Sequence, residues 1–134
     1  MIEVIIPGKP MSQKRHRDSK NGGKYDPSKQ DKKRIRNLFL QHKPTKPLEC
    51  LLRVDIYAFF ETPKSWSKKK RKEARGKFRA KTPDVDNLQK IIFDALNKYV
   101  YKDDAQIVSS KTEKYYSTKP CTVIRITKIE QEYI

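Results

Sequence analysis

The chain has 134 residues, of which 32 are lysine or arginine and 16 are aspartate or glutamate, giving a formal net charge of +16 at pH 7. This length suits one domain, spanning 1–134, with a modest core, and the positive excess fits a polyanionic partner, nucleic acid before an anionic membrane surface. The longest apolar runs are far shorter than the roughly 20 residues of a spanning helix, so we expect no membrane protein.

A strand and a basic arm are the first predicted elements. Alternating aliphatic residues in segment 2–6, closed by a Pro-Gly pair, predict a short strand. Residues 9–24 lack periodicity, contain a Gly-Gly pair and are rich in basic residues. This arm is either a solvated, mobile loop or a flexible element that orders on a phosphate backbone, and the two interpretations are compatible. Its candidate DNA-binding residues are Lys14, Arg15 and Arg17.

A helix and a strand follow the arm. Asp26 and the proline after it have the pattern of an N-cap and a first helical residue, so we expect a helix to begin there and to end before the prolines of 43–47. Segment 48–60 alternates apolar with mixed side chains, which predicts a central antiparallel strand with one covered face. Asp55 lies on the mixed face, where pairing with a neighbouring base is a better interpretation than metal binding.

Residues 62–83 form a basic insertion. Ser67 can cap a short helix, KKKRKEAR, which Gly76 stops, and six of those eight residues are basic. So small an apolar face favours a nucleic-acid contact over a merely solvated helix. Trp66 is either a packing anchor for the insertion, the interpretation we favour, or a surface stacking residue. The candidate DNA-binding residues of the insertion are Lys68, Lys69, Lys70, Arg71 and Lys72.

The C-terminal part predicts two more strands, at 106–116 and 121–129, joined by a turn. Cys50 and Cys121 each lie in an apolar run, which favours reduced, buried positions in a cytoplasmic protein, and neither is in zinc-ligand spacing with a histidine. Together these elements predict a small α+β domain in which a mixed or antiparallel sheet of about four strands packs with helices.

The carboxylates gather in one stretch of the chain, residues 81–107. Five aspartates lie there within 21 residues: Asp84, Asp86, Asp94, Asp103 and Asp104. Residues 1–83 contain 24 basic and 8 acidic residues, a net charge of +16, whereas residues 84–134 contain 8 of each. The whole positive excess therefore precedes the acidic stretch.

An extended corner and an amphipathic helix are predicted within this stretch. Thr82 precedes a proline and is pushed toward extended geometry, so Asp84 and Asp86 point the same way. Asp86 is also a good N-cap for a helix whose apolar residues between 88 and 96 follow helical spacing.

The polar side of that helix carries further candidate residues. Lys90 and Asp94 lie opposite the apolar stripe, roughly in line with Asp86. A break follows at 98–102. Asp103 and Asp104 can then fold back beside the corner, because the helix carries the chain out and a strand returns it.

Carboxylates grouped in a positive protein indicate a bound cation. Without a cation, the carboxylates repel a phosphodiester. Mg²⁺ binds carboxylate oxygens and substrate phosphate, and it can polarise the phosphate and orient a water. Lys90 can offset the carboxylate charge, position the water or steady developing negative charge. Such aspartate pairs also occur as caps and turns, but the charge context favours metal-dependent phosphodiester hydrolysis over that structural role.

The segment PDVDNLQKIIFDAL followed by VYKDDAQI resembles the signature of the RusA-like Holliday junction resolvases. The opening strand with PGKP, the basic arm and PKSWSKKKRKEA extend the resemblance over most of the chain. It implies that Asp84, Asp86 and Asp104 are metal-binding catalytic carboxylates. Asp103 lies beside them as a further metal ligand, and Lys90 is the catalytic-site lysine.

The same resemblance implies a small α+β homodimer that cuts four-way DNA junctions by paired incisions in recombination and repair. It also implies Mg²⁺ as cofactor, with Mn²⁺ as a substitute, and an origin among phages and prophages. A symmetric dimer suits two symmetric cuts. No nucleotide cofactor is expected, since the four glycines form no phosphate-cradling pattern.

Two alternatives stay open at this point. A non-catalytic basic nucleic-acid-binding protein explains the net charge but not the five clustered aspartates. A nuclease of linear DNA or of RNA shares the metal site and differs only in substrate geometry.

Overall fold

A four-stranded sheet organises the chain in the computed structural model, which describes residues 1–14, 17–18 and 22–131. Its strands are β1 (Ile2–Pro7), β4 (Leu51–Glu61), β5 (Ile107–Ser117) and β6 (Cys121–Ile129), in the order β1-β6-β4-β5. Strand β6 is antiparallel to β1 and β4, whereas β4 and β5 are parallel. The expected α+β fold with a mixed sheet is confirmed.

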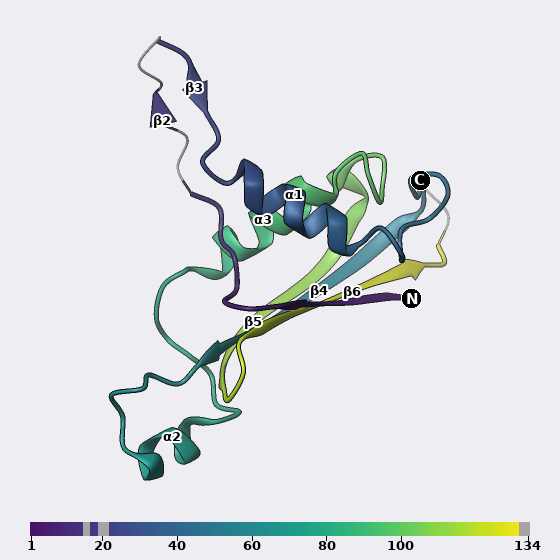
Figure 1. Ribbon diagram of the computed structural model, residues 1–134. Helices are drawn as coiled ribbons and strands as arrows, with labels where there is room; N and C mark the ends of the chain where they lie inside the picture. The colour runs from purple at the N-terminus through teal and green to yellow at the C-terminus, as the bar shows by residue number, and fades with distance from the viewer. Residues whose placement is uncertain (15–16, 19–21, 132–134) are drawn as a thin grey trace.

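Two helices, α1 (Lys29–Leu38) and α3 (Val85–Leu96), lie together on one face of this sheet (Figure 1). Alternate residues of β4 from 52 to 60 are buried against them, as expected for a strand with one covered face. The apolar stripe of α3 faces the sheet, and its buried residues are those that the helical spacing predicted: Leu88, Ile91, Ile92, Ala95 and Leu96. A short helix, α2 (Lys68–Ala74), lies beyond one end of the sheet (Figure 1).

Helix α1 begins later than expected. Its N-cap is Ser28, so the prediction that Asp26 caps the helix is wrong. The reason is local: Asp26 Oδ1 accepts the backbone N–H of Ser28 at 2.9 Å and holds this segment in a turn before the helix starts. Asp26 also accepts hydrogen bonds from Gln13 Nε2 at 3.0 Å and from Lys32 Nζ at 2.6 Å.

Strand β4 also begins later than predicted, at Leu51. Leu48 instead forms an isolated parallel bridge with Tyr101, and its N–H donates to the carbonyl of Val100 at 2.9 Å. The other difference lies in pairing, because β4 has the parallel strand β5 on one side rather than two antiparallel neighbours. A parallel pair needs a long crossover, which the chain makes through α2 and α3.

Two short strands inside the basic arm were not predicted. They are β2 (Arg17–Asp18) and β3 (Lys24–Tyr25), which pair antiparallel. Figure 1 shows them projecting beyond α1. Strands of two residues lack the periodicity by which strands are recognised in a sequence.

Cys50 and Cys121 are free and half-buried rather than fully buried. Among the helices of the described segments, none is long and apolar enough to cross a membrane.

A 3-10 helix, η1 (Asp104–Gln106), connects the region after α3 to β5. The buried side chain of Gln106 donates from Nε2 to the carbonyls of Leu48 at 2.8 Å and Cys50 at 2.9 Å. Its Oε1 accepts the N–H of Asp103 at 2.9 Å, and Asp103 in turn accepts the N–H of Ala105 at 3.1 Å. The reciprocal cap holds η1 together, and the two hydrogen bonds from Gln106 Nε2 fasten η1 to the segment before β4.

The first prediction concerns this buried amide. Gln106→Ala removes a donor from the carbonyls of Leu48 and Cys50 and the acceptor of the Asp103 N–H, so we expect the free energy of unfolding to fall by about 1–3 kcal/mol in urea denaturation. Gln30→Ala, on the exposed side of α1, is the matched control and should change it by less than about 0.5 kcal/mol. An equal effect of both substitutions would contradict the structural role of Gln106.

The contacts of Asp26 also make stability depend on pH. Burial raises the pKa of Asp26, but hydrogen bonds from Lys32, Ser28 and Gln13 outweigh burial and lower the pKa from 3.8 to about 2. Because the pKa is lower in the folded than in the unfolded state, the stabilisation is fully present above pH 3.8 and is lost as the pH falls toward 2.

We therefore expect Asp26→Asn to lower the free energy of unfolding by about 1–2 kcal/mol at pH 6 and by about half as much at pH 3. Urea denaturation of both proteins across this pH range measures the difference. Asp31→Asn removes the same charge from the first turn of α1 and serves as the control. The same pH dependence in both variants would rule out the contacts of Asp26 as its cause.

Candidate active site

Asp84 and Asp86, here called the acidic corner, lie at the start of α3. Asp84 is the N-cap, with an extended backbone (φ −72°, ψ 154°), and its side chain makes no capping hydrogen bond. The prediction that Asp86 is the N-cap is therefore wrong: Asp86 lies in the first turn, because extended geometry continues only as far as Asp84. Both carboxylates are exposed, and the positive end of the helix dipole favours their charge.

Two cations hold the loop that leads into the acidic corner, through the backbone carbonyls of residues 81–83. Lys114 Nζ donates to two of these oxygens at 2.7 and 3.0 Å, and Arg79 Nη1 donates to two at 3.2 and 2.8 Å. The Arg79 guanidinium also lies 4.1 Å from the centre of the Phe60 ring. These contacts fix the backbone directly before Asp84, and no pattern in the sequence predicted them.

The basic arm departs beside the acidic corner. The N–H of Gln13 donates to the carbonyl of Asn87 at 3.0 Å, in the first turn of α3. The next residue, Lys14, is exposed, and its N–H donates to Ser28 Oγ at 3.0 Å. Of the other predicted contacts in the arm, Arg15 lies outside the described residues, and only the backbone of Arg17 is described, as part of β2.

Helix α2 has no buried residue, as its composition indicated. Ser67 caps it, accepting the N–H of Lys70 at 3.2 Å, as expected. Trp66 packs against Tyr116 with ring centroids 5.3 Å apart, which confirms the packing interpretation. The Lys70 ammonium lies 4.2 Å from the centre of the Trp66 ring, so this predicted DNA contact already has a partner within the chain.

The remaining cations of α2 divide into two groups. Arg71 is half-buried; its Nε donates to Thr62 Oγ1 at 3.0 Å and its Nη2 lies 4.0 Å from Glu61. Its contacts therefore fasten α2 to the end of β4. The other exposed members of the predicted set, besides Lys70, are Lys68, Lys69 and Lys72.

Lys90 is exposed on α3, one turn after Asp86, where the helical spacing placed it. Its neighbour Gln89 donates from Nε2 to Ser110 Oγ on β5 at 3.3 Å. The polar side of α3 near the acidic corner therefore lies along β5.

The second acidic pair belongs to η1. The hydrogen bond from the Ala105 N–H lowers the pKa of Asp103, and its contact with Asp104 lowers this pKa further. The pKa of Asp104 is raised instead, because its carboxyl is partly buried and because the charges of Asp103 and Asp94 lie nearby.

The part of α3 that contains Asp94 lies near Asp103 and Asp104. Tyr101 is fully buried, and its hydroxyl donates to the carbonyl of Phe93 at 2.8 Å. Burial raises the pKa of Tyr101, and the charges of Asp104 and Asp94 raise it further. Asp94 lies 3.6 Å from Lys32 Nζ, so its charge is paired with α1, which favours a structural role for Asp94.

The two acidic groups do not form one closed metal cage. Asp94, the α3 carboxylate that acts on Asp104, lies about 12 Å along the helix axis from Asp86. Among the described residues, no group of three or more His, Cys, Asp or Glu side chains is arranged to hold a metal ion. The chain folds back along α3 as expected, since Asp94 acts on Asp104, and the grouping of Asp84, Asp86 and Asp104 in one metal site stays a prediction.

The donor chemistry of the acidic corner nonetheless fits a hard divalent cation. It offers two exposed carboxylates, and Mg²⁺ is commonly held by one or two carboxylates together with substrate phosphate and water. Asp103 is a weaker ligand candidate than the sequence indicated, because its carboxylate caps η1.

Comparison with known proteins agrees with the resemblance seen in the sequence. Residues 7–127 match the family model described as Endodeoxyribonuclease RusA. The chain is also similar to the uncharacterized protein YqaN of Bacillus subtilis (strain 168), with 36% identity over 137 residues that cover 96% of each chain. The match to the family model includes the acidic corner, Lys90 and η1. The chain therefore belongs to the RusA family of endodeoxyribonucleases.

Proposed function

We propose that the protein is a Mg²⁺-dependent endonuclease that resolves four-way DNA junctions by paired, symmetric incisions, acting as a homodimer in recombination and repair. Membership of the RusA family supports hydrolysis of DNA. The observation that carries the proposal is the acidic corner, two exposed carboxylates beside the base of a basic arm in a chain of net charge +16.

Each residue of the site has a distinct role in this proposal. Asp84 and Asp86 hold Mg²⁺, which Mn²⁺ can replace, and Asp104 is the third carboxylate. The ion supplies charge stabilisation and orients a water. Lys90, exposed one turn after Asp86, steadies negative charge on the phosphate. Asp103 acts as a positioning residue through the cap of η1.

The DNA backbone is bound by exposed lysines whose side chains have no ion pair with another described residue. Lys14 is exposed next to the acidic corner. Three exposed lysines of α2, other than the Lys70 that contacts Trp66, lie on the insertion that leads into the corner: Lys68, Lys69 and Lys72. Contacts of this kind release counterions, so junction binding is expected to weaken as salt rises.

The test of the catalytic assignment is Asp84→Asn. Removing one carboxylate weakens metal binding, so we expect cleavage of a synthetic four-way junction to fall about a hundredfold or more, with folding and junction binding largely retained. The assay compares the junction with a matched linear duplex, and each substrate is tested with and without Mg²⁺. Glu130→Gln, at an exposed position after β6, is the control carboxylate substitution.

Wild-type rates of cleavage in Asp84→Asn would contradict the assignment, and so would loss of fold and binding together. Tight, salt-sensitive binding of the junction with no cutting under any divalent metal would leave a non-catalytic DNA-binding protein. Equal cutting of the linear duplex would remove the junction specificity.

A second test addresses the loop before the acidic corner. Lys114→Met removes two hydrogen bonds to the carbonyls of this loop, so Asp84 is held less firmly. We expect the single-turnover cleavage rate to fall about tenfold, with junction affinity nearly unchanged and partial recovery in Lys114→Arg. Lys119→Met removes the same charge from the exposed turn before β6 and is the control. Equal loss of affinity in both methionine variants, with no change in rate, would refute the positioning role.

A further inference from the structure

A small cavity lies at the end of the sheet where β4 stops. Its volume is about 200 Å³, and the residues that line it, here called the side pocket, come from four segments of the chain: Lys9, Phe60, Glu61, Arg79 and Pro120. Phe60 is buried in one hydrophobic cluster with Leu88, near the start of α3. One wall of the side pocket therefore belongs to the packing that holds the start of α3.

Arg79 connects the side pocket to the acidic corner. Its Nη1 donates to the carbonyl of Thr82 at 2.8 Å, and Thr82 is two residues before Asp84. Two residues span at most about 7 Å of extended chain. A group bound in the side pocket therefore lies within about 14 Å of Asp84, which is no more than about four phosphates at a rise of about 3.4 Å along one DNA strand.

The side chains around the side pocket carry an excess of positive charge. Lys9 is exposed and has no ion pair with another described residue. Arg79 uses Nη1 for both of its hydrogen bonds to backbone carbonyls. Glu61 is the one carboxylate of the lining, and Arg71 Nη2 lies 4.0 Å from it, which offsets its charge. Two cations that have no carboxylate of their own line the cavity, and such a pair attracts an anion.

The turn that carries Lys9 is fixed by contacts on both sides. Gly8 has a φ of 94°, which a glycine adopts without steric cost, and its N–H donates to the carbonyl of Pro120 at 3.1 Å. The carbonyl of Pro7 accepts a hydrogen bond of 2.8 Å from Arg34 Nη2 on α1. The segment PGKP therefore holds the backbone of Lys9 in place at the rim of the side pocket.

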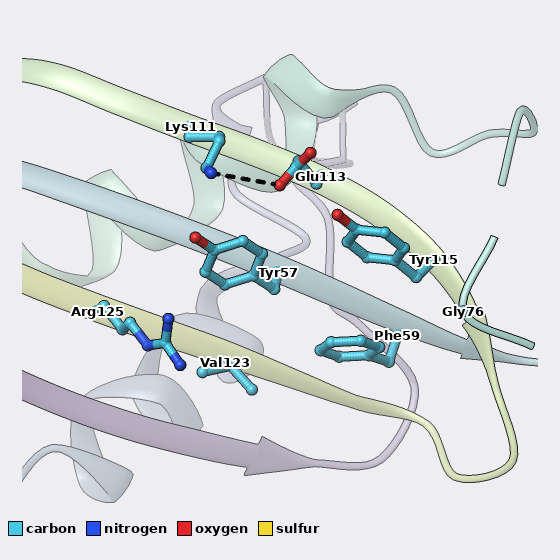
Figure 2. Close-up of a pocket in the computed structure, with 8 residues that line it drawn as sticks. All are labelled: Tyr57, Phe59, Gly76, Lys111, Glu113, Tyr115, Val123 and Arg125. Carbon is cyan, nitrogen blue, oxygen red and sulfur yellow. Dashed lines mark ion pairs between the residues drawn. The ribbon is translucent and has the colours of Figure 1, made fainter. Parts of the chain in front are cut away.

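A larger cavity, of about 510 Å³, lies on the face of the sheet opposite α1 and α3 and lacks this excess of charge. Figure 2 shows the ring of Tyr57 there, between Lys111 and Arg125. Lys111 Nζ lies 3.7 Å from Glu113 Oε1, and Arg125 Nε lies 2.6 Å from Glu3 Oε2. Since both cations already have a carboxylate partner, the larger cavity does not suit a phosphate.

We propose that the side pocket binds a backbone phosphate of the DNA strand whose scissile phosphate lies at the acidic corner, with Lys9 and Arg79 as its ligands. The inference deepens the proposed function, on which it rests, by adding a second contact on the strand that is cut. Two fixed contacts on one strand set its position and its direction relative to the acidic corner. A contact with a phosphate carries no sequence information, so Lys9 serves binding and not base selection.

The test begins with Lys9, because Arg79 also holds the loop before the acidic corner. Without Mg²⁺, we expect Lys9→Met to bind a synthetic four-way junction about three- to tenfold more weakly at about 0.1 M salt, with a salt dependence reduced by about one phosphate contact. Lys9→Arg should retain most of the affinity. Lys46→Met, in the exposed loop before β4 at the other end of the sheet, is the control, and circular dichroism shows whether each variant is folded.

Neutral phosphates then identify the contact. Junctions that each carry one methylphosphonate, at successive positions near the crossover, remove one negative charge at a time. The wild-type chain should lose about three- to tenfold in affinity at the phosphate that the side pocket holds. In Lys9→Met the same methylphosphonate should cost less than about twofold, because the contact is already missing.

Three results would overturn the inference. One is an affinity of folded Lys9→Met within twofold of the wild-type value. Another is an equal loss in Lys46→Met, which would reduce the effect to general charge. The last is a set of methylphosphonate penalties that is the same in Lys9→Met and in the wild-type chain. Failure of the proposed function is separate, because it appears as absent Mg²⁺-dependent cleavage of the unmodified junction and leaves these binding measurements intact.

Discussion

The packing of the apolar stripe of α3 on the sheet is the contact on which the rest of the structure depends. It buries one side of the helix, so Asp86, Lys90 and Asp94 lie on the other side. The acidic corner then comes at one end, beside the base of the basic arm, and Asp94 comes near the other end, beside Tyr101 and η1. One hydrophobic contact therefore fixes the placement of both acidic groups.

Several lysines and arginines of the chain hold the fold together. Lys32 pairs with Asp26 and Asp94, Arg71 fastens α2 to the end of β4, and Arg79 and Lys114 hold carbonyl oxygens before the acidic corner. Partly buried cations remain stable only when such partners satisfy them. Net charge alone therefore overstates the surface that can bind DNA.

Patterns within short segments determined most of the secondary structure. The alternation in β1, β4 and β6, the helical stripe of α3 and the break after it all appear where the sequence predicted them, because periodicity reports which side of an element is buried. The family was also recognisable from the resemblance of PDVDNLQKIIFDAL and VYKDDAQI to its signature, and that resemblance implied the residues of the acidic corner and Lys90. The first residues of the helices were predicted less accurately. Asp26 forms a turn before α1 instead of capping it, and Asp84 rather than Asp86 is the N-cap of α3.

Contacts between distant segments were decided only by the tertiary structure. Gln106 bonds to carbonyls 58 and 56 residues away, and the same fold gives β4 a parallel neighbour and makes Asp94 a neighbour of Asp104. No local pattern encodes such pairs, because each depends on how the crossover through α2 and α3 lies on the sheet. The sequence by itself thus determined which residues are available for chemistry, and the tertiary structure decided which of them meet, since distance in space is set by packing.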